Sequence, residues 1–260
     1  MGHALLIAGS YGKMGAAIIA AQGCMRSGVG LLTCHIPGSG LQIMQTVLPE
    51  AMVLTDFNSS YCTKLEGDLS KYKAIGIGPG LGTAQETRSL LKDVLQQWQG
   101  NLVLDADALN CISIDKTLLD QLPTGTILTP HPKELERLFG VFENDFERLE
   151  VVLREAKNRK LVIILKGHYT CVATPEGQAY FNSTGNAGMA TAGSGDLLTG
   201  ILIGLLAQGY DSVSAAMLGV YVHGLAGDIA ADKLSMESML ASDMATHLGS
   251  AFRRIYKNQE

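Results

Sequence analysis

The sequence predicts an α/β fold in which helices cover both faces of a mainly parallel central sheet. Short apolar runs alternate with longer helical stretches over the first two thirds of the 260 residues. The chain has 30 glycines and only 6% aromatic residues, which suits short strand-to-helix loops better than an all-β sandwich. Because 47% of the residues are hydrophobic and only 17% are charged, we expect a large buried core.

Apolar runs bounded by glycine, proline or polar residues predict the strands, and alanine-rich or amphipathic stretches predict the helices. Strands are expected at residues 4–8, 30–35, 51–54, 74–77, 102–105, 127–129, 161–166, 170–173 and 178–181. Helices are expected at residues 16–26, 41–47, 84–98, 142–158, 197–207, 211–231 and 242–256. The last two strands flank Pro175-Glu176-Gly177, which predicts a hairpin.

The chain contains no internal repeat, low-complexity tract or Pro/Ser-rich linker. The most polar stretch, residues 57–73, has the composition of a surface connection. We therefore expect one domain over residues 1–260.

Composition excludes several classes of partner. A net charge of -5 disfavours a nucleic-acid or anionic-membrane surface, and the apolar run 197–207 is too short to cross a bilayer. The five cysteines include no C-x-x-C pair, which is typical of reduced buried thiols and makes a zinc site unexpected. Because the N-terminus lacks a secretion signal, we expect a cytoplasmic protein without nucleic-acid or membrane partners.

The most informative segment is the glycine-rich stretch 185–196, which ends at Asp196 and runs directly into an apolar helix. Free N–H groups at a helix start, beside glycines that admit a ligand, form an anion-binding turn. An acid at its edge would repel phosphate, but it could take a proton from a hydroxyl group. The alternative is a structural turn with Asp196 as the helix N-cap, and the length of the small-residue loop favours the functional interpretation.

In an open parallel sheet, ligands bind at the carboxyl ends of the strands. Every candidate segment falls at such an end: the loop at Gly9, residues 78–82, Asp105, His131, Lys166 and the Asp196 loop. This agreement among separate loops is stronger evidence than any single motif.

The turn Gly9-x-x-Gly12-x-x-Gly15 resembles a dinucleotide-binding turn. Its spacing is not G-x-G-x-x-G, and the next strand ends Thr33-Cys34-His35 without the acid that such sites use to hold ribose. We therefore reject a hydride-transferring dehydrogenase.

Read together, the motifs resemble the ribokinase-like superfamily, and within it the ADP/ATP-dependent NAD(P)H-hydrate dehydratases. The matching stretches are residues 9–16, 26–31, 78–82, 105–110, 129–134, 165–167 and 185–196. Sugar kinases of the superfamily carry Asn-x-x-Glu near the phosphates, whereas this chain has His131-Pro132-Lys133-Glu134, which fits the dehydratases better. The chain also begins almost at the first strand, without the short N-terminal lead common in relatives.

The resemblance implies a three-layer ribokinase-like fold and a lyase that repairs hydrated NADH and NADPH (NADHX and NADPHX). Such enzymes dehydrate the S-form of NAD(P)HX and consume ADP or ATP, with Mg²⁺ as cofactor. Without a preceding epimerase domain, the chain looks like the stand-alone bacterial type, which usually prefers ADP and works beside a separate NAD(P)HX epimerase. A homotetramer is also implied.

The resemblance assigns Asp196 as the catalytic residue, which would deprotonate the ring hydroxyl as the terminal phosphoryl group of the nucleotide is transferred to it. It implies these substrate contacts: Ala21, Gly80, Gly82, His131 and Asp196. It implies these nucleotide contacts: Lys166, Gly167, His168, Tyr169, Thr170, Gly193, Ser194 and Gly195.

Each assignment has a plainer alternative from the residues alone. Residues 166–170 could be an ordinary hairpin turn with Lys166 solvated, and His131 between two prolines could be a structural turn residue. Gly-Pro-Gly at 78–80 is a common turn, and the chemistry of Ala21 indicates only close packing.

No direct metal ligand is assigned. Asp105 and Glu134 could hold Mg²⁺ directly or through water, and Asp107 could instead cap the helix that contains Ala108 and Leu109.

Two rival functions stay open. A small-molecule kinase of the same superfamily, acting on a hydroxymethylpyrimidine- or hydroxyethylthiazole-like alcohol, would accumulate a phosphorylated product. A non-catalytic nucleotide-binding module would show no turnover, although an intact Asp196 and glycine turn disfavour it.

Overall fold

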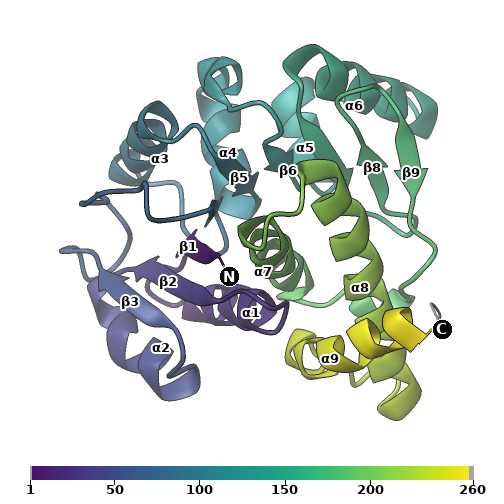
Figure 1. Cartoon of the computed structure of the whole chain (residues 1–260). Helices are drawn as coiled ribbons and strands as arrows, with labels where there is room; N and C mark the ends of the chain where they lie inside the picture. Colours follow the sequence, from purple (N-terminus) through teal and green to yellow (C-terminus); the bar gives the residue numbers. More distant parts are fainter. Residues whose placement is uncertain (1, 258–260) are drawn as a thin grey trace.

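A single nine-stranded sheet organises the chain. The computed structural model describes residues 2–257 and places the strands in the order β3-β2-β1-β4-β5-β6-β7-β8-β9 (Figure 1). The strands are β1 (His3–Ile7), β2 (Leu31–Ile36), β3 (Met52–Thr55), β4 (Ala74–Ile77), β5 (Asn101–Leu104), β6 (Ile127–Leu128), β7 (Val162–Leu165), β8 (Cys171–Ala173) and β9 (Ala179–Phe181). Neighbours from β3 to β7 pair in parallel, and β7-β8 and β8-β9 pair antiparallel. The mainly parallel sheet and the terminal hairpin are confirmed.

Helices follow most strands and cover both faces of the sheet (Figure 1). They are α1 (Met14–Met25), α2 (Leu41–Val47), α3 (Gln85–Gln97), α4 (Ala106–Ile114), α5 (Pro132–Phe139), α6 (Asp145–Arg159), α7 (Ser194–Ala207), α8 (Ser212–Lys233) and α9 (Ala241–Lys257). Short 3₁₀ turns lie at Gly38–Gly40, Lys116–Gln121 and Ala187–Met189.

The buried apolar residues form one cluster on each side of the sheet. One cluster joins α1, α7, α8 and α9 to side chains such as Leu6 and Val103. The other joins α3, α4, α5 and α6 to the alternate side chains, such as Leu5 and Leu104. Successive strand residues point to opposite faces, so this alternation produces the three-layer α/β architecture that the sequence predicts.

Two local predictions are wrong. The sequence places residues 193–196 in a loop, but α7 begins at Ser194 with Gly193 as its N-cap, so Asp196 is the third helical residue. The alternative role of Asp107 as a helix cap also fails, because Asp105 occupies the N-cap position of α4 and Asp107 lies in its first turn. In addition, α5 begins at Pro132, three residues after the predicted strand 127–129, and no helix is predicted there.

Helix α8 satisfies the length and hydropathy expected of a membrane span, but 67% of its apolar window is buried inside the fold. It contributes Val222, Ala226 and Ala230 to the core cluster. Its apolar character is therefore explained by its place inside the fold.

Helices α1 and α7 approach closely because glycines face backbone atoms across their interface. A Cβ atom on Gly200 would lie 1.9 Å from the carbonyl oxygen of Ala20, and one on Gly23 would lie 2.5 Å from that of Leu197. This contact fixes the position of α7, whose first turn carries Asp196.

We expect Gly200→Ala to destabilise the protein by roughly 2 kcal/mol or more, because the backbones of α1 and α7 must separate. The matched control is Gly249→Ala in α9, where an added Cβ meets nothing within 4 Å and alanine favours the helix. Urea unfolding of the two variants measures the difference. Equal midpoints for both variants would contradict the close-packing argument.

Candidate active site

The loops that follow β1 and β4 are joined to each other at the carboxyl edge of the sheet. The N–H of Gly9 donates to the carbonyl oxygen of Pro79 at 2.8 Å, and the Ser10 hydroxyl donates to that of Gly80 at 2.7 Å. Gly78 has a φ of +132°, and a Cβ there would lie 1.8 Å from the carbonyl oxygen of Asp105. The loop 78–82 therefore packs directly against the end of β5.

A cavity of about 750 Å³ opens beside this edge, between the ends of β5 and β7 and the start of α7. Nine of the predicted site residues line it: His131, Lys166, Gly167, His168, Thr170, Gly193, Ser194, Gly195 and Asp196. These residues come from three separate segments of the chain, so the fold assembles most of the predicted nucleotide site in one place.

Four predicted site residues lie outside this cavity lining. Tyr169 is 68% exposed on the β7–β8 turn, and Ala21 is fully buried in α1. Gly80 and Gly82 lie on the joined loops, where the N–H of Gly82 donates to a carboxylate oxygen of Asp107 at 2.8 Å. Their ligand roles stay predictions.

Lys166 is the centre of a buried charge network. Its Nζ atom lies 2.7 Å from Oδ1 of Asp105 and 3.9 Å from Oε2 of Glu134, two carboxylates whose side chains are 1% and 6% exposed. The Thr199 hydroxyl donates to the other oxygen of Asp105 at 2.8 Å. Burial alone would lower the pKa of Lys166, but these two carboxylates raise it, so the ammonium group is charged. The solvated-lysine alternative is therefore wrong.

Asp196 lies beside this network, and the pKa of its carboxyl group is raised. Burial is the main cause, and the nearby negative charge of Asp105 adds to it, so the pKa of Asp196 rises to about 6 although Lys166 opposes the shift. A carboxylate whose pKa lies near physiological pH can both accept and release a proton.

The turn before Asp196 presents unpaired backbone donors. Gly193 has a φ of +89°, which glycine adopts readily, and it starts α7 directly. The first N–H groups of a helix have no partner within the helix, so those of Gly195 and Asp196 are available to a ligand. Together with the positive end of the helix dipole, they give this turn the geometry and charge that suit an anion.

His131 and Glu134 form a reciprocal cap at the start of α5. Nδ1 of His131 accepts the N–H groups of Lys133 and Glu134, and a carboxylate oxygen of Glu134 accepts the N–H of His131 at 2.9 Å. The structural turn interpretation of His131 is therefore confirmed. The ring is 44% exposed and also borders the cavity, so a contact with substrate stays a prediction.

Sequence reasoning missed two residues of α8 that contact the glycine-rich segment before Asp196. The carboxylate of Asp228 in α8 accepts the N–H of Gly185 at 2.9 Å and the side-chain amide of Asn186 at 3.0 Å. Also in α8, His223 contacts Ser194. The available signal was the presence of a histidine and an aspartate within an otherwise apolar helix.

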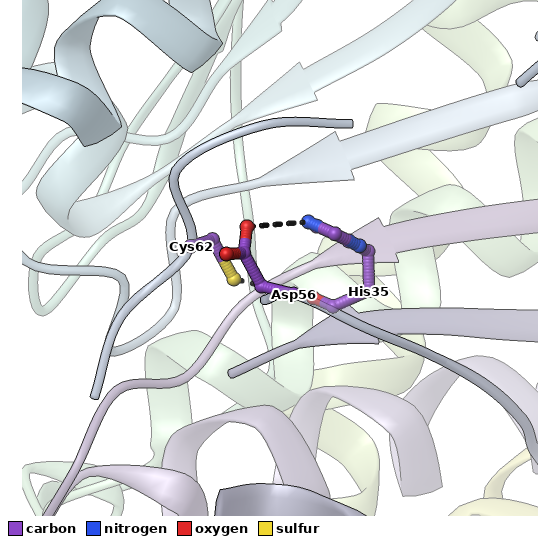
Figure 2. A group of neighbouring side chains, drawn as sticks. All are labelled: His35, Asp56 and Cys62. Carbon is purple, nitrogen blue, oxygen red and sulfur yellow. Dashed lines mark hydrogen bonds and ion pairs between the residues drawn. The ribbon is translucent and has the colours of Figure 1, made fainter. Parts of the chain in front are cut away.

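A group of potential metal ligands lies elsewhere, between β2 and the loop after β3. Figure 2 shows His35, Asp56 and Cys62, whose ligand atoms lie within 4.8 Å of one another. Both oxygens of Asp56 already accept two hydrogen bonds each, from the loop residues Asn58, Thr63 and Lys64. Burial lowers the pKa of His35. We therefore assign this group to the structure of the loop.

Comparison with known proteins agrees with the geometry. The Carb_kinase family model, described as NAD(P)H-hydrate dehydratase, matches residues 4–249. The bifunctional NAD(P)H-hydrate repair enzyme of Moorella thermoacetica is 38% identical over 268 residues, which cover 100% of this chain and 51% of that protein. The chain thus spans about half the length of this curated relative.

Solved structures give the same result at the level of the fold. The ADP/ATP-dependent NAD(P)H-hydrate dehydratase from Bacillus subtilis, co-crystallised with ATP/Mg²⁺, superposes with a TM-score of 0.84 at 33% identity and covers 97% of this chain and 89% of its own. A ribokinase-like superfamily protein from Enterococcus faecalis superposes with a TM-score of 0.83 at 28% identity and covers 97% and 87%. The chain therefore belongs to the NAD(P)H-hydrate dehydratase family and has its ribokinase-like fold.

Proposed function

We propose that this chain catalyses the ADP- or ATP-dependent dehydration of the S-form of NADHX and NADPHX, which returns them to NADH and NADPH. The observation that carries the proposal is Asp196 in the first turn of α7. There it combines a pKa of about 6 with an adjacent anion-binding turn and cavity. A proton acceptor beside donors for phosphate is the arrangement that phosphoryl transfer to an alcohol requires.

The reaction needs phosphorylation because the ring hydroxyl is a poor leaving group. Asp196 takes the hydroxyl proton while the oxygen attacks the terminal phosphoryl group of ADP, and AMP leaves. The N–H groups of Gly195 and Asp196 stabilise the charge on the transferring phosphoryl group. The lone pair of the ring nitrogen then expels phosphate, and loss of a proton from the neighbouring ring carbon restores the reduced nicotinamide.

The fold supports a separate position for each ligand. The cavity lined by residues 166–168, Thr170 and the start of α7 suits the nucleotide, because it combines a cationic side chain with helix N–H groups. The loops after β1 and β4 lie where the strand order reverses, which is the place where α/β sheets bind dinucleotides. Gly80 and Gly82 lie on these loops, so we place the hydrated dinucleotide there.

Mg²⁺ fits the carboxylates present, through water. Both oxygens of Asp105 already accept hydrogen bonds, from Lys166 and Thr199, so it would hold the ion through bound water together with Glu134 and Asp196. When bound, the ion would neutralise phosphate charge.

The test is incubation with chemically hydrated NADH, Mg²⁺ and either ADP or ATP. We expect the absorbance of reduced nicotinamide to reappear together with free phosphate and AMP or ADP. A stable phosphorylated product would support a kinase instead, and no nucleotide consumption would support a binding module. Repeating the assay with hydrated NADPH and both nucleotides measures the preferences.

The proposal also covers the domain organisation of the chain, its compartment, its oligomeric state and the source of its substrate. We propose that residues 1–260 act as one domain, that the protein works in the cytoplasm as a homotetramer, and that a separate epimerase supplies the S-form. Size-exclusion chromatography with light scattering measures the oligomer.

A further inference from the structure

Helix α8 is packed tightly against the segment that leads into the catalytic turn. A Cβ atom on Gly224 would lie 2.2 Å from the Thr184 hydroxyl, and one on Gly227 would lie 2.4 Å from the sulfur of Met189. The Thr184 hydroxyl also donates to the carbonyl oxygen of Tyr221 at 2.9 Å. Helix α8 therefore packs against both ends of segment 184–189, at Thr184 and at Met189.

His223 extends this support to the first residue of α7. Its Nε2 atom lies 2.9 Å from the carbonyl oxygen of Ser194 and 3.3 Å from the Ser194 hydroxyl. A carbonyl oxygen only accepts hydrogen bonds, so Nε2 must carry the proton and donate it. The side chain is 9% exposed and borders the cavity.

The position of this bond matters because Ser194 is followed by Gly195 and Asp196. Glycine at the second helical position leaves the backbone of this turn free to move, since it has no side chain to pack. The carbonyl group of Ser194 and the N–H of Gly195 belong to one planar peptide group, so the hydrogen bond from His223 fixes the direction of that N–H, one residue before the catalytic carboxylate. Burial lowers the pKa of His223 to about 4, so the ring stays neutral and does not add a cation to the site.

We propose that His223 is a positioning residue that holds the first turn of α7 in the geometry needed for phosphoryl transfer, an inference that rests on the proposed function. It acts through the Ser194 carbonyl group, to which its Nε2 atom donates. Misplacement of catalytic groups by about 1 Å costs roughly 10²-fold in rate.

The test compares variants that differ only in the group offered to Ser194. His223→Leu keeps the approximate volume and removes the donor, whereas His223→Gln places an amide N–H near the position of Nε2. We expect His223→Leu to lower kcat by roughly 10²-fold and to weaken ADP binding about tenfold, and His223→Gln to recover most of both losses. The larger effect on kcat than on ADP binding separates positioning from a general loss of folding.

Two further variants complete the set. His223→Asn keeps a polar side chain but places its amide near Nδ1, too short to reach Ser194. It should therefore show the same losses in kcat and ADP binding that we expect of His223→Leu, and it provides the test if His223→Leu does not fold. His247→Leu is the matched control, because Nδ1 of His247 also bonds a helix carbonyl oxygen, that of Asp243 at 2.8 Å, in α9 away from the cavity lining. It should leave kcat and ADP binding unchanged.

The outcomes separate this inference from the proposed function. If the wild-type chain dehydrates NADHX but His223→Leu and His223→Asn match it, or His223→Gln is as poor as both, the positioning role is overturned and the function stands. If the wild type binds Mg-ADP without dehydration, the function fails. Weaker ADP binding in His223→Leu and His223→Asn, restored in His223→Gln, would then still support the role at the anion-binding turn. A wild-type chain that binds no nucleotide overturns both.

Discussion

Replacement of Asp196 by asparagine is expected to lower turnover by about 10²–10⁴-fold, the usual contribution of a general base. The amide keeps the shape of the carboxylate and cannot accept the hydroxyl proton, so binding of ADP should change only a few-fold. Rates of NADH recovery and calorimetric ADP binding measure the two quantities. Asp115→Asn is the control, since the Asp115 carboxylate accepts hydrogen bonds from Thr117 and does not line the cavity. An Asp196→Asn variant with wild-type turnover would remove this residue from the chemistry.

The raised pKa of Asp196 predicts how the proposed activity depends on pH. Asp196 must be deprotonated to act as a base, and its pKa is raised to about 6, first by burial and then by the charge of Asp105. We therefore expect kcat/KM to fall tenfold per pH unit below about pH 6. A midpoint near pH 4, the range of an ordinary aspartate, would show that the charged form is not disfavoured at this site.

Stability should show the opposite response to the substitution. Because the folded state raises the pKa of Asp196 from 3.8, the charged carboxylate destabilises the fold at pH values above 6, and this cost disappears below about pH 4. Asp196→Asn should thus be more stable than the wild type by on the order of 2 kcal/mol at pH 8, and the gain should vanish at low pH. Denaturant unfolding at both pH values measures it. An equal gain in stability at pH 8 and at low pH would show that the charge of Asp196 is not its cause.

The sheet and most of the cavity lining could be predicted from the sequence, for different physical reasons. Buried parallel strands appear as apolar runs between loop residues, so β4 (Ala74–Ile77) is predicted with its observed bounds. The candidate ligand groups could be placed together because parallel strands bring their carboxyl ends to one edge. His131 and Lys166 both line the cavity, although 34 residues lie between them in the sequence.

What the sequence could not provide were the long-range side-chain pairings and the start of α7. Glycine has low helix propensity, so Gly193-Ser194-Gly195 is interpreted as a loop, yet tertiary packing against α1 extends the helix to Ser194. The bond from Lys166 to Asp105 joins residues 61 apart, and that from Thr199 to Asp105 joins residues 94 apart. No local pattern encodes such a partner, so the solvated-lysine alternative could not be rejected before the fold was known.

Substitution of Lys166 by methionine is expected to have the largest effect on stability. It leaves Asp105 and Glu134 buried without their cation, and breaking a buried ion pair in this way costs about 3–5 kcal/mol. Burial already raises the pKa of Glu134 and Lys166 opposes that rise, so without the lysine the loss should be greatest at pH 8 and should shrink as the pH falls and Glu134 becomes protonated. Nucleotide binding should weaken as well, because the cavity loses its buried ammonium group.

A double variant separates lost charge pairing from lost packing. Asp105→Asn in the Lys166→Met background removes one of the two stranded charges without changing its shape, so it should recover part of the stability that Lys166→Met alone loses. Lys64→Met is the control: Nζ of Lys64 lies 2.8 Å from Glu66, but both side chains are exposed, and its urea midpoint should match the wild type. If Lys166→Met behaved like Lys64→Met, charge pairing would not be what holds the network around Asp105. A pH-independent loss would point to packing by the lysine stem, whereas a loss that fades on acidification identifies unpaired buried charge as its origin.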